Sequence, residues 1–344
     1  MKVKFRKTVK VALVLVYLVI IAGAVVRMTG SGMGCPDWPK CFGYYIPPTE
    51  LSELQFKPNH DYKKGVVIIV DETLQVAKEN FTSGESLDLS HWNKYTAHDY
   101  ATFNPVHTWV EYINRLSGAL SGIPILIFTI MSIWLWKDRK RYLLLSIFTV
   151  VAMGFQAWLG KTVVDSNLAP FKITIHMVMA LVIVAVILYL IFISKEKFKL
   201  VKFDPLFKNV LIFATLLTLV QIVLGTQVRQ HVDEQVKAIG YIKSLWLDNP
   251  TLDFYIHRTL SILVLAVNVW LYYRNKKQHL GYTKLDWVLV CIALEILTGM
   301  AMYYFDFPFS TQTLHLVIAT ILIGIQFYIV LESSRRSVDK TAIA

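Results

Sequence analysis

Apolar runs alternate with polar segments along almost the whole chain. Eight of these runs lie near 9–27, 108–136, 142–163, 171–194, 208–229, 254–273, 285–305 and 312–332. A helix of roughly 20 apolar residues spans the hydrocarbon core of a bilayer, and each run meets that length. The pattern therefore predicts an all-α, polytopic membrane protein with eight transmembrane helices.

One long polar segment, 28–105, separates the first two runs and has no counterpart later in the chain. It opens with a stretch rich in Gly and Pro, 28–41, which predicts a turn-rich loop. Val66–Val70 is a short apolar run that predicts a strand. We expect this insertion to form an extracytoplasmic cap over the first half. His60, His91 and His98 lie in it without the spacing of a metal site, so a solvated surface position is favoured for all three.

The two halves of the chain repeat short motifs. Glu-Tyr-Ile-Asn-Arg-Leu-Ser at 111–117 resembles Tyr-Ile-His-Arg-Thr-Leu-Ser at 255–261, and Thr-Ile-His at 174–176 resembles Thr-Leu-His at 313–315. The repeats predict two pseudo-symmetric four-helix bundles, an N-terminal one over 1–200 and a C-terminal one over 201–344. A helical bundle can hold a cofactor between side chains on facing helices.

Composition and charge fix the class of protein and its orientation. The chain is 55% hydrophobic and 17% charged, with a mean hydropathy of +0.49, which excludes an ordinary soluble domain. Its net charge of +11 comes from basic groups in 2–10, 137–141, 195–208, 274–284 and 335–336. By the positive-inside rule both termini face the cytoplasm of a cell (plasma) membrane protein. The basic charge thus indicates orientation and not nucleic-acid binding.

The first apolar run also has features of a cleaved signal peptide. It has a basic start and a small-residue site at Ala22-Gly-Ala24. However, Ala24-Val-Val-Arg27 at its end resembles Thr226-Gln-Val-Arg229 at the end of the fifth run. A removed segment would not need a counterpart in the second half, so a retained first helix is favoured.

The repeat pairs Asn114 with His176 and His257 with His315. Each pair is separated by two further helix passages, which brings both members to one depth near the outer surface. Histidines on both sides of a flat cofactor are what a six-coordinate heme needs. The alternative for a lone histidine is a packed or interfacial residue, but ionisable groups rarely enter membrane helices in register without a function.

Glu111 lies one helical turn before Asn114, and His107 lies two turns before it, so the three side chains share one stripe. A carboxylate at this depth is costly and predicts a functional site, with a hydrogen-bonded partner for Arg115 as the alternative. Arg115 and Arg258 follow the candidate ligand positions directly. Their charges suit heme propionates, or they extend to the lipid headgroups.

Three further groups of polar residues have structural interpretations. Cys35 and Cys41, in an outer loop, are candidates for a disulfide, with unpaired thiols or an exposed redox-active pair as alternatives. Cys291 is interpreted as a small apolar filler. The intramembrane polar residues are expected to form interhelical hydrogen bonds. They are Gln156, Gln221 and Glu295.

These motifs together resemble the heme A synthase family over nearly the full length. The resemblance rests on eight helices, the Gly-x-Gly-x-Gly-Cys-Pro-Asp-Trp-Pro-x-Cys stretch at 30–41, Glu-x-x-x-Arg at 111–115 and the three helix histidines. It implies oxidation of the C8 methyl of substrate heme O to the formyl of product heme A, for cytochrome oxidase. It also implies heme b between His257 and His315, with substrate heme O in the first half.

The resemblance assigns further roles. Glu111 would be the catalytic carboxylate, and Cys35 and Cys41 would form the loop disulfide. Arg27, Arg229 and Arg258 are candidate propionate contacts. The expected partners are the lipid bilayer, heme O, heme O synthase, cytochrome oxidase assembly factors and a second copy in a homo-oligomer.

Asn114 departs from the family pattern, which has a histidine at this position. Asn is a poor ligand for heme iron. His176 alone could hold the substrate heme, His107 could substitute, or the site could be inactive. We favour His176 alone, because His107 lies about 10 Å along the helix axis from Asn114. The competing functions are a b-type cytochrome that carries electrons and a heme-delivery protein.

Overall fold

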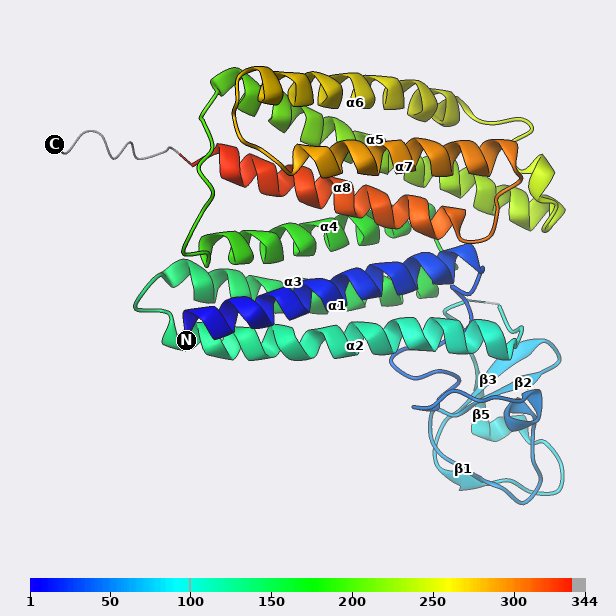
Figure 1. Cartoon of the computed structure of the whole chain (residues 1–344). Coiled ribbons are helices and arrows are strands. Elements are labelled where there is room, and N and C mark those ends of the chain that lie inside the picture. The colour runs from blue at the N-terminus through cyan, green and yellow to red at the C-terminus, as the bar shows by residue number, and fades with distance from the viewer. Residues whose placement is uncertain (99, 336–344) are drawn as a thin grey trace. The chain divides into compact units, whose positions relative to one another are not determined.

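The computed structural model describes residues 1–98 and 100–335, and this part of the chain contains eight helices long and apolar enough to cross a membrane (Figure 1). They are α1 (Lys2–Met28), α2 (Pro105–Trp134), α3 (Lys140–Asp165), α4 (Pro170–Ile193), α5 (Pro205–Ile239), α6 (Leu252–Lys277), α7 (Leu285–Tyr304) and α8 (Thr311–Ser333). The predicted eight-helix membrane protein is confirmed.

The chain forms two compact units. The first, called here the long-bundle unit, comprises 1–17, 123–152 and 177–344, so it holds α5–α8 and one end of each of α1–α4. The second, called the cap unit, comprises 18–122 and 153–176 and holds the other ends of α1–α4 together with the segment between α1 and α2. Two bundles divided near residue 200 stay a prediction from the repeats.

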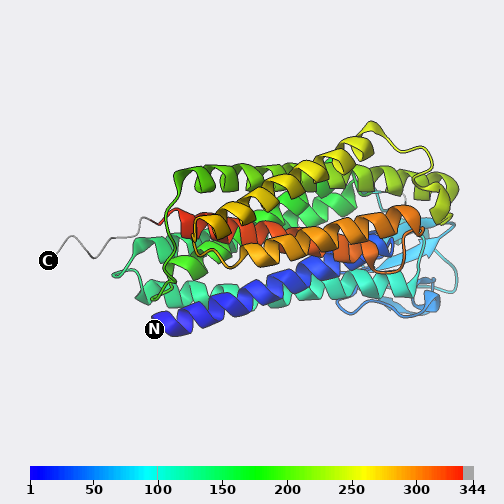
Figure 2. The same ribbon diagram turned by 45° about the horizontal axis from the view of Figure 1, so that its top comes forward.

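In the long-bundle unit, α5 packs against α6 and α8, and α7 packs against α6 and α8. Figures 1 and 2 show these four helices side by side. Their apolar side chains form one core, because a helix that is apolar on most faces must bury part of its surface against others. The core includes Leu211, Val264, Leu271, Val288, Ile292, Leu322 and Ile329.

Helix α5 is longer than its apolar run. The hydropathy pattern predicted a span that ends near residue 229, whereas the helix continues to Ile239. The added turns carry Gln230, Asp233 and Glu234, which are polar and therefore do not register as membrane-spanning. His231 consequently lies inside α5.

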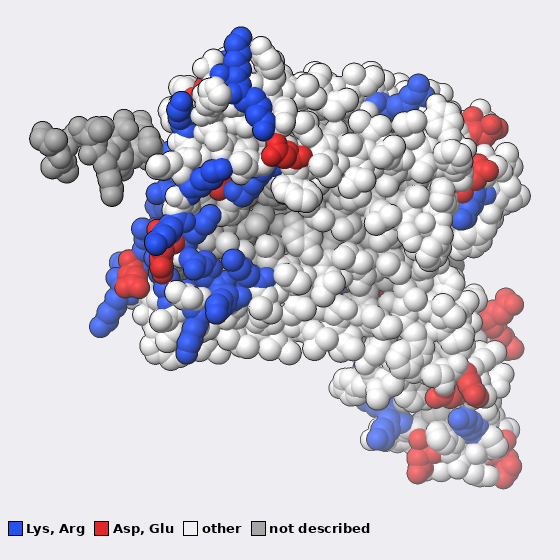
Figure 3. Space-filling view, viewed as in Figure 1, with Lys and Arg blue, Asp and Glu red and all other residues white. Residues whose placement is uncertain are grey.

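Basic side chains gather at one end of the long-bundle unit, where α1 begins and α8 ends (Figure 3). They come from the start of α1, the α2–α3 and α6–α7 connections and the segment between α4 and α5. This distribution agrees with the basic segments on which the predicted orientation depends. Position 336 of the basic tail lies outside the described residues.

Between α1 and α2, the cap unit carries two small antiparallel sheets. One has the order β2 (Val67–Val70), β3 (Thr73–Ala77) and β5 (Trp92–Lys94), and the other pairs β1 (Asp61–Tyr62) with β4 (Phe81–Thr82). The strand predicted at 66–70 is confirmed, while the other four were not predicted because they are short and not apolar throughout. The aromatic rings of Tyr62 on β1, Phe81 on β4 and Trp92 on β5 contact one another, so the two sheets pack together.

Candidate functional site

In the long-bundle unit, the rings of His257 on α6 and His315 on α8 face each other. Their centres lie 6.3 Å apart, with an angle of 66° between the ring planes. An imidazole nitrogen lies about 2 Å from the metal it binds, and its ring centre lies about 1 Å farther out. Two axial imidazoles on one iron therefore place their ring centres roughly 6 Å apart. The pair has the separation that bis-histidine heme ligation requires.

A glycine on the preceding helix lies beside each ring of this pair. A Cβ placed on Gly225 of α5 would lie 3.2 Å from Cε1 of His257, and one on Gly299 of α7 would lie 3.6 Å from Cε1 of His315. A side chain at either position would occupy space next to the imidazole. The glycines thus leave room for the rings to lie close to the neighbouring helix.

The cap unit repeats this arrangement at its two candidate positions. A Cβ on Gly160 of α3 would lie 3.4 Å from Cε1 of His176 on α4, and one on Gly23 of α1 would lie 3.7 Å from Oδ1 of Asn114 on α2. All four candidate positions therefore have a glycine on the preceding helix. Asn114 occupies the position that the motif alignment assigns to a histidine.

Two glutamines bind the backbone of the histidine-bearing helices. Gln156 Nε2 donates to the carbonyl oxygen of His176 at 3.0 Å, and Gln221 Nε2 donates to that of His257 at 2.7 Å. The predicted interhelical hydrogen bonds are confirmed for both. Each bond fixes the helix backbone at the candidate ligand, and among the described residues Nδ1 of neither ring has a hydrogen-bond partner.

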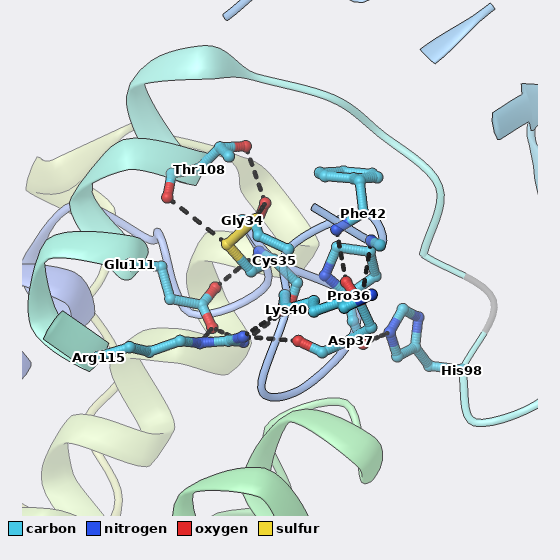
Figure 4. Close-up of a disulfide and its surroundings, with 12 residues drawn as sticks. Gly34, Cys35, Pro36, Asp37, Lys40, Phe42, His98, Thr108, Glu111 and Arg115 are labelled. Carbon is cyan, nitrogen blue, oxygen red and sulfur yellow. Dashed lines mark hydrogen bonds and ion pairs between the residues drawn. A yellow bond between two sulfur atoms is a disulfide. The ribbon is translucent and has the colours of Figure 1, made fainter. Parts of the chain in front are cut away.

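In the cap unit, Glu111 of α2 is buried, with 4% of its surface exposed. Its Oε2 accepts a hydrogen bond from the backbone N–H of Cys35 at 2.9 Å, and its Oε1 lies 2.5 Å from Nη2 of Arg115 (Figure 4). A buried carboxylate needs such partners because water no longer solvates its charge. The structure therefore connects the predicted catalytic carboxylate directly to the cysteine loop.

Arg115 extends this connection to the loop backbone. Its Nη1 donates to the carbonyl oxygens of Asp37 and Lys40, and its Nη2 donates to that of Cys35, at 2.5, 3.0 and 2.9 Å (Figure 4). The guanidinium thus uses its planar set of donors to fix the loop between the two cysteines against α2. The equivalent Arg258 of α6 is exposed.

Asp37 also stabilises the cysteine loop, through its own side chain. Its two carboxylate oxygens accept from the backbone N–H groups of Phe42 and Gly43 at 2.5 and 2.8 Å. Burial raises the pKa of Asp37 above its ordinary value, and the two N–H donors and Arg115 offset only part of that rise. The half-buried carboxylate of Asp37 therefore holds the loop at Phe42 and Gly43, while the buried carboxylate of Glu111 binds it at Cys35 from α2.

Cys35 and Cys41 form a disulfide, with Cα atoms 4.7 Å apart. Both residues are buried, with 0% and 1% of their surfaces exposed, among apolar residues that include Phe42 and Leu54. The prediction of a disulfide is confirmed. The redox-active alternative assumed an exposed pair, whereas both cysteines are buried. The loop reaches α2 because Gly34 has no side chain: a Cβ there would lie 2.4 Å from the backbone oxygen of His107.

Three further residues were predicted to belong to the site, and the structure places each of them on a helix. His107 Nδ1 lies 3.3 Å from the carbonyl oxygen of Gly30, at the end of α2 that meets the loop. Arg229 Nη2 forms an ion pair with Asp233 one turn later on α5, at 2.7 Å. Arg27 lies in the last turn of α1.

Comparison with known protein families identifies the family of this chain. The profile of the cytochrome oxidase assembly proteins (COX15-CtaA) matches residues 6–83 and 87–327. The chain belongs to this family.

Several relatives are similar over most of their length. The heme A synthase of Flavobacterium johnsoniae is 23% identical over 92% of this chain and 93% of its own length. That of Pelagibacter ubique is 24% identical over 93% of this chain and 94% of its own length. That of Shewanella oneidensis is 25% identical over 70% of this chain and 62% of its own length. The family membership agrees with the resemblance found from the motifs.

Sequence reasoning missed two contacts of this family member. His98, expected at a solvated surface, is partly buried, and its Nε2 lies 3.2 Å from the carbonyl oxygen of Pro36 in the cysteine loop. Asp37 was not predicted to have a role of its own, although its carboxylate accepts the backbone N–H groups of Phe42 and Gly43. The signal available in the sequence was its position between the two cysteines, shortly before Gly43.

Proposed function

We propose that this protein is a heme A synthase, which oxidises a methyl group of heme O to the formyl group of heme A. Membership of the family and the similarity to heme A synthases over nine-tenths of the chain support this function. The single observation that carries it is the pair His257 and His315, whose ring centres lie 6.3 Å apart in a membrane helix bundle.

The second half would hold a resident heme b on this pair. Bound heme would supply one-electron transfer, because imidazoles at both axial positions leave no site for oxygen. His257 and His315 would provide the ligands, and Gly225 and Gly299 would leave space beside the rings.

The first half would bind substrate heme O through His176 alone. Nδ1 of His176 and Oδ1 of Asn114 are buried without a hydrogen-bond partner among the described residues. Asn114 would line the pocket without ligating iron, which leaves one face of the substrate accessible. Arg27 would serve the propionates of this heme, and Arg229 and Arg258 those of heme b.

Glu111 would handle protons or stabilise charge during the oxidation. Its burial and its position one turn before Asn114 on α2 support this role. Its bonds to Arg115 and to Cys35 N–H also give it a structural function, which any test must separate from catalysis.

Pigment analysis tests the activity. The protein is purified from cells that make heme O, and the extracted hemes are identified by chromatography. Accumulation of hydroxylated or formyl heme is the expected result, and its loss in His176→Ala would support the substrate site. Heme b alone in the wild-type protein would contradict the synthase and favour an electron carrier. A larger loss of bound substrate heme from His107→Ala than from His176→Ala would overturn the ligand assignment.

Two variants separate catalysis by Glu111 from its structural function. Glu111→Gln keeps an oxygen that can accept from Cys35 N–H, whereas Arg115→Lys removes the bidentate contacts to the loop. We expect the Gln variant to retain hemes and a protease-resistant loop but to lose formyl product by at least tenfold. Equal protease sensitivity in the two variants, with product lost in proportion, would assign Glu111 to structure alone.

The cellular context follows from this function. The enzyme would lie in the plasma membrane with both termini in the cytoplasm and the hemes near the outer face. It would receive heme O from a heme O synthase and deliver heme A to cytochrome oxidase assembly factors, in a homo-oligomer or alone. The basic end of the long-bundle unit supports this orientation (Figure 3).

A further inference from the structure

The ring nitrogen Nδ1 of His315 has two hydrogen-bond partners on α7. Thr298 Oγ1 lies 2.8 Å from it and Glu295 Oε2 lies 3.1 Å from it. The Thr298 hydroxyl has one hydrogen, and its geometry directs that hydrogen to backbone carbonyls of its own helix, with Leu294 O at 2.8 Å. It therefore presents a lone pair to the ring. Nδ1 carries the hydrogen, and Nε2 is left as the nitrogen that can bind a metal.

Helix α7 differs at these two positions from the other helices that carry this motif. Glu295 lies one turn before Gly299, and Thr298 lies directly before it. The corresponding residues are Gln156 and Leu159 on α3, and Gln221 and Leu224 on α5. A carboxylate and a hydroxyl thus replace an amide and an alkyl group, and the two replacements meet at the same atom.

The other histidines lack this arrangement. The glutamines donate to the backbone oxygens of His176 and His257, and Nδ1 of each ring has no hydrogen-bond partner in the described part of the chain. Glutamate has no N–H to donate to a carbonyl, so its side chain bonds the ring. His315 is therefore the one histidine of the three whose ring orientation is fixed by side-chain acceptors.

We propose that Glu295 and Thr298 are positioning residues that hold His315 in its metal-binding tautomer and lower the reduction potential of the heme bound by His257 and His315. The inference rests on the heme b site proposed above. An acceptor on Nδ1–H increases electron donation from Nε2 and so stabilises ferric iron more than ferrous iron. The resident heme is therefore a stronger electron donor than it would be if Nδ1–H of His315 had no acceptor.

Redox titration of the purified protein tests this. Glu295→Leu removes the carboxylate acceptor, and we expect the ratio of reduced to oxidised heme at fixed potential to rise about tenfold, which is about 59 mV for one electron. Thr298→Val, nearly the same shape, should shift the ratio in the same direction but less. Glu295→Gln introduces the amide found at the equivalent positions 156 and 221, which bonds a backbone carbonyl and not the ring, so it should shift the ratio in the same direction as Glu295→Leu. Gln221→Leu is the matched control, because it breaks a bond to the His257 backbone and removes no hydrogen bond to either ring.

The outcomes separate this inference from the proposed function. Heme content and the low-spin spectrum are measured on every variant and on His257→Ala and His315→Ala. If wild type binds no low-spin heme, or if these two alanine variants retain it, the heme b site itself is wrong. If the site holds but Thr298→Val and both Glu295 variants titrate like the Gln221→Leu control, the positioning role is wrong. If Glu295→Leu cannot be purified, Thr298→Val and Glu295→Gln decide the question.

Discussion

At the scale of single residues, the space beside each candidate ligand depends on a glycine in the neighbouring helix. Gly225 is the tightest of the four positions, because its Cβ would lie 3.2 Å from His257 Cε1, closer than ordinary van der Waals contact. We expect Gly225→Ala to displace the imidazole and to reduce the low-spin heme signal several-fold. Gly299→Ala, at 3.6 Å, should have a smaller effect, since that distance needs little adjustment.

Absorbance spectra of the purified variants, normalised to protein, measure this order. Gly154→Ala is the matched control, because it also lies inside a membrane helix and its Cβ would meet no atom within 4 Å. The glycine argument is wrong if the control loses as much heme as the Gly225 variant. It is also wrong if Gly299→Ala loses more.

The repeated motifs located His257 and His315 from the sequence because a similar spacing of motifs in the two halves is a property of the chain itself. They did not reveal that Glu295 bonds the His315 ring while Gln221 bonds a backbone carbonyl. Those contacts depend on how each helix is rotated about its own axis. A hydropathy pattern identifies the buried face of a helix but not its exact rotation. Arg115 illustrates the same limit, since its loop partners are distant in sequence.

At the scale of elements, Asp204 begins the long helix α5. Its Oδ1 accepts from the backbone N–H of Phe207 at 3.0 Å, and Arg274 of α6 donates to both of its oxygens at 2.9 and 3.2 Å. Burial acts to raise the pKa of Asp204, but the Arg274 and Phe207 bonds outweigh it and lower the pKa below its ordinary value. The folded state therefore favours the charged carboxylate.

This lowered pKa predicts a pH dependence. The stabilisation is fully present above the ordinary aspartate pKa of about 4 and is lost as the pH falls through the lower pKa of the folded state. Asp204→Asn keeps an N-cap acceptor and removes the charge, so we expect it to reduce the free energy of unfolding by about 1 kcal/mol at pH 7. The difference from wild type should be smaller at about pH 3 than at pH 7.

Unfolding in detergent micelles at both pH values measures the difference. Asp286→Asn is the control, because Asp286 is half-exposed and lies 3.8 Å from Lys276, a surface pair that contributes little. A difference for Asp204→Asn that stays constant with pH would show that shape, and not charge, determines the effect.

The membrane helices were predicted from the sequence more accurately than the strands of the cap unit. Eight apolar runs became eight helices, because a bilayer requires every backbone group to be bonded within the segment. In the cap, strands such as Asp61–Tyr62 pair with partners about 20 residues away, so local sequence carries little signal for them. The polar extension of α5 to Ile239 was missed for a similar reason, since only its apolar part resembles a span.

At the scale of the whole molecule, the order of helices predicts which connections share a side of the membrane. The cap segment lies between α1 and α2, and the α6–α7 connection follows five further crossings, so the two should lie on opposite sides. By the positive-inside rule, the basic residues of the second connection predict that it faces the cytoplasm.

Cysteine labelling in intact cells tests this orientation. The natural background is low, because Cys35 and Cys41 are bonded to each other and Cys291 is buried. Ser86→Cys in the cap and Lys277→Cys at the end of α6 place exposed thiols in the two connections. We expect a membrane-impermeant maleimide to label the first in intact cells and the second only after permeabilisation. The reverse pattern would invert the predicted orientation, and labelling of both in intact cells would contradict the crossing order, because an odd number of spans must separate the two sites.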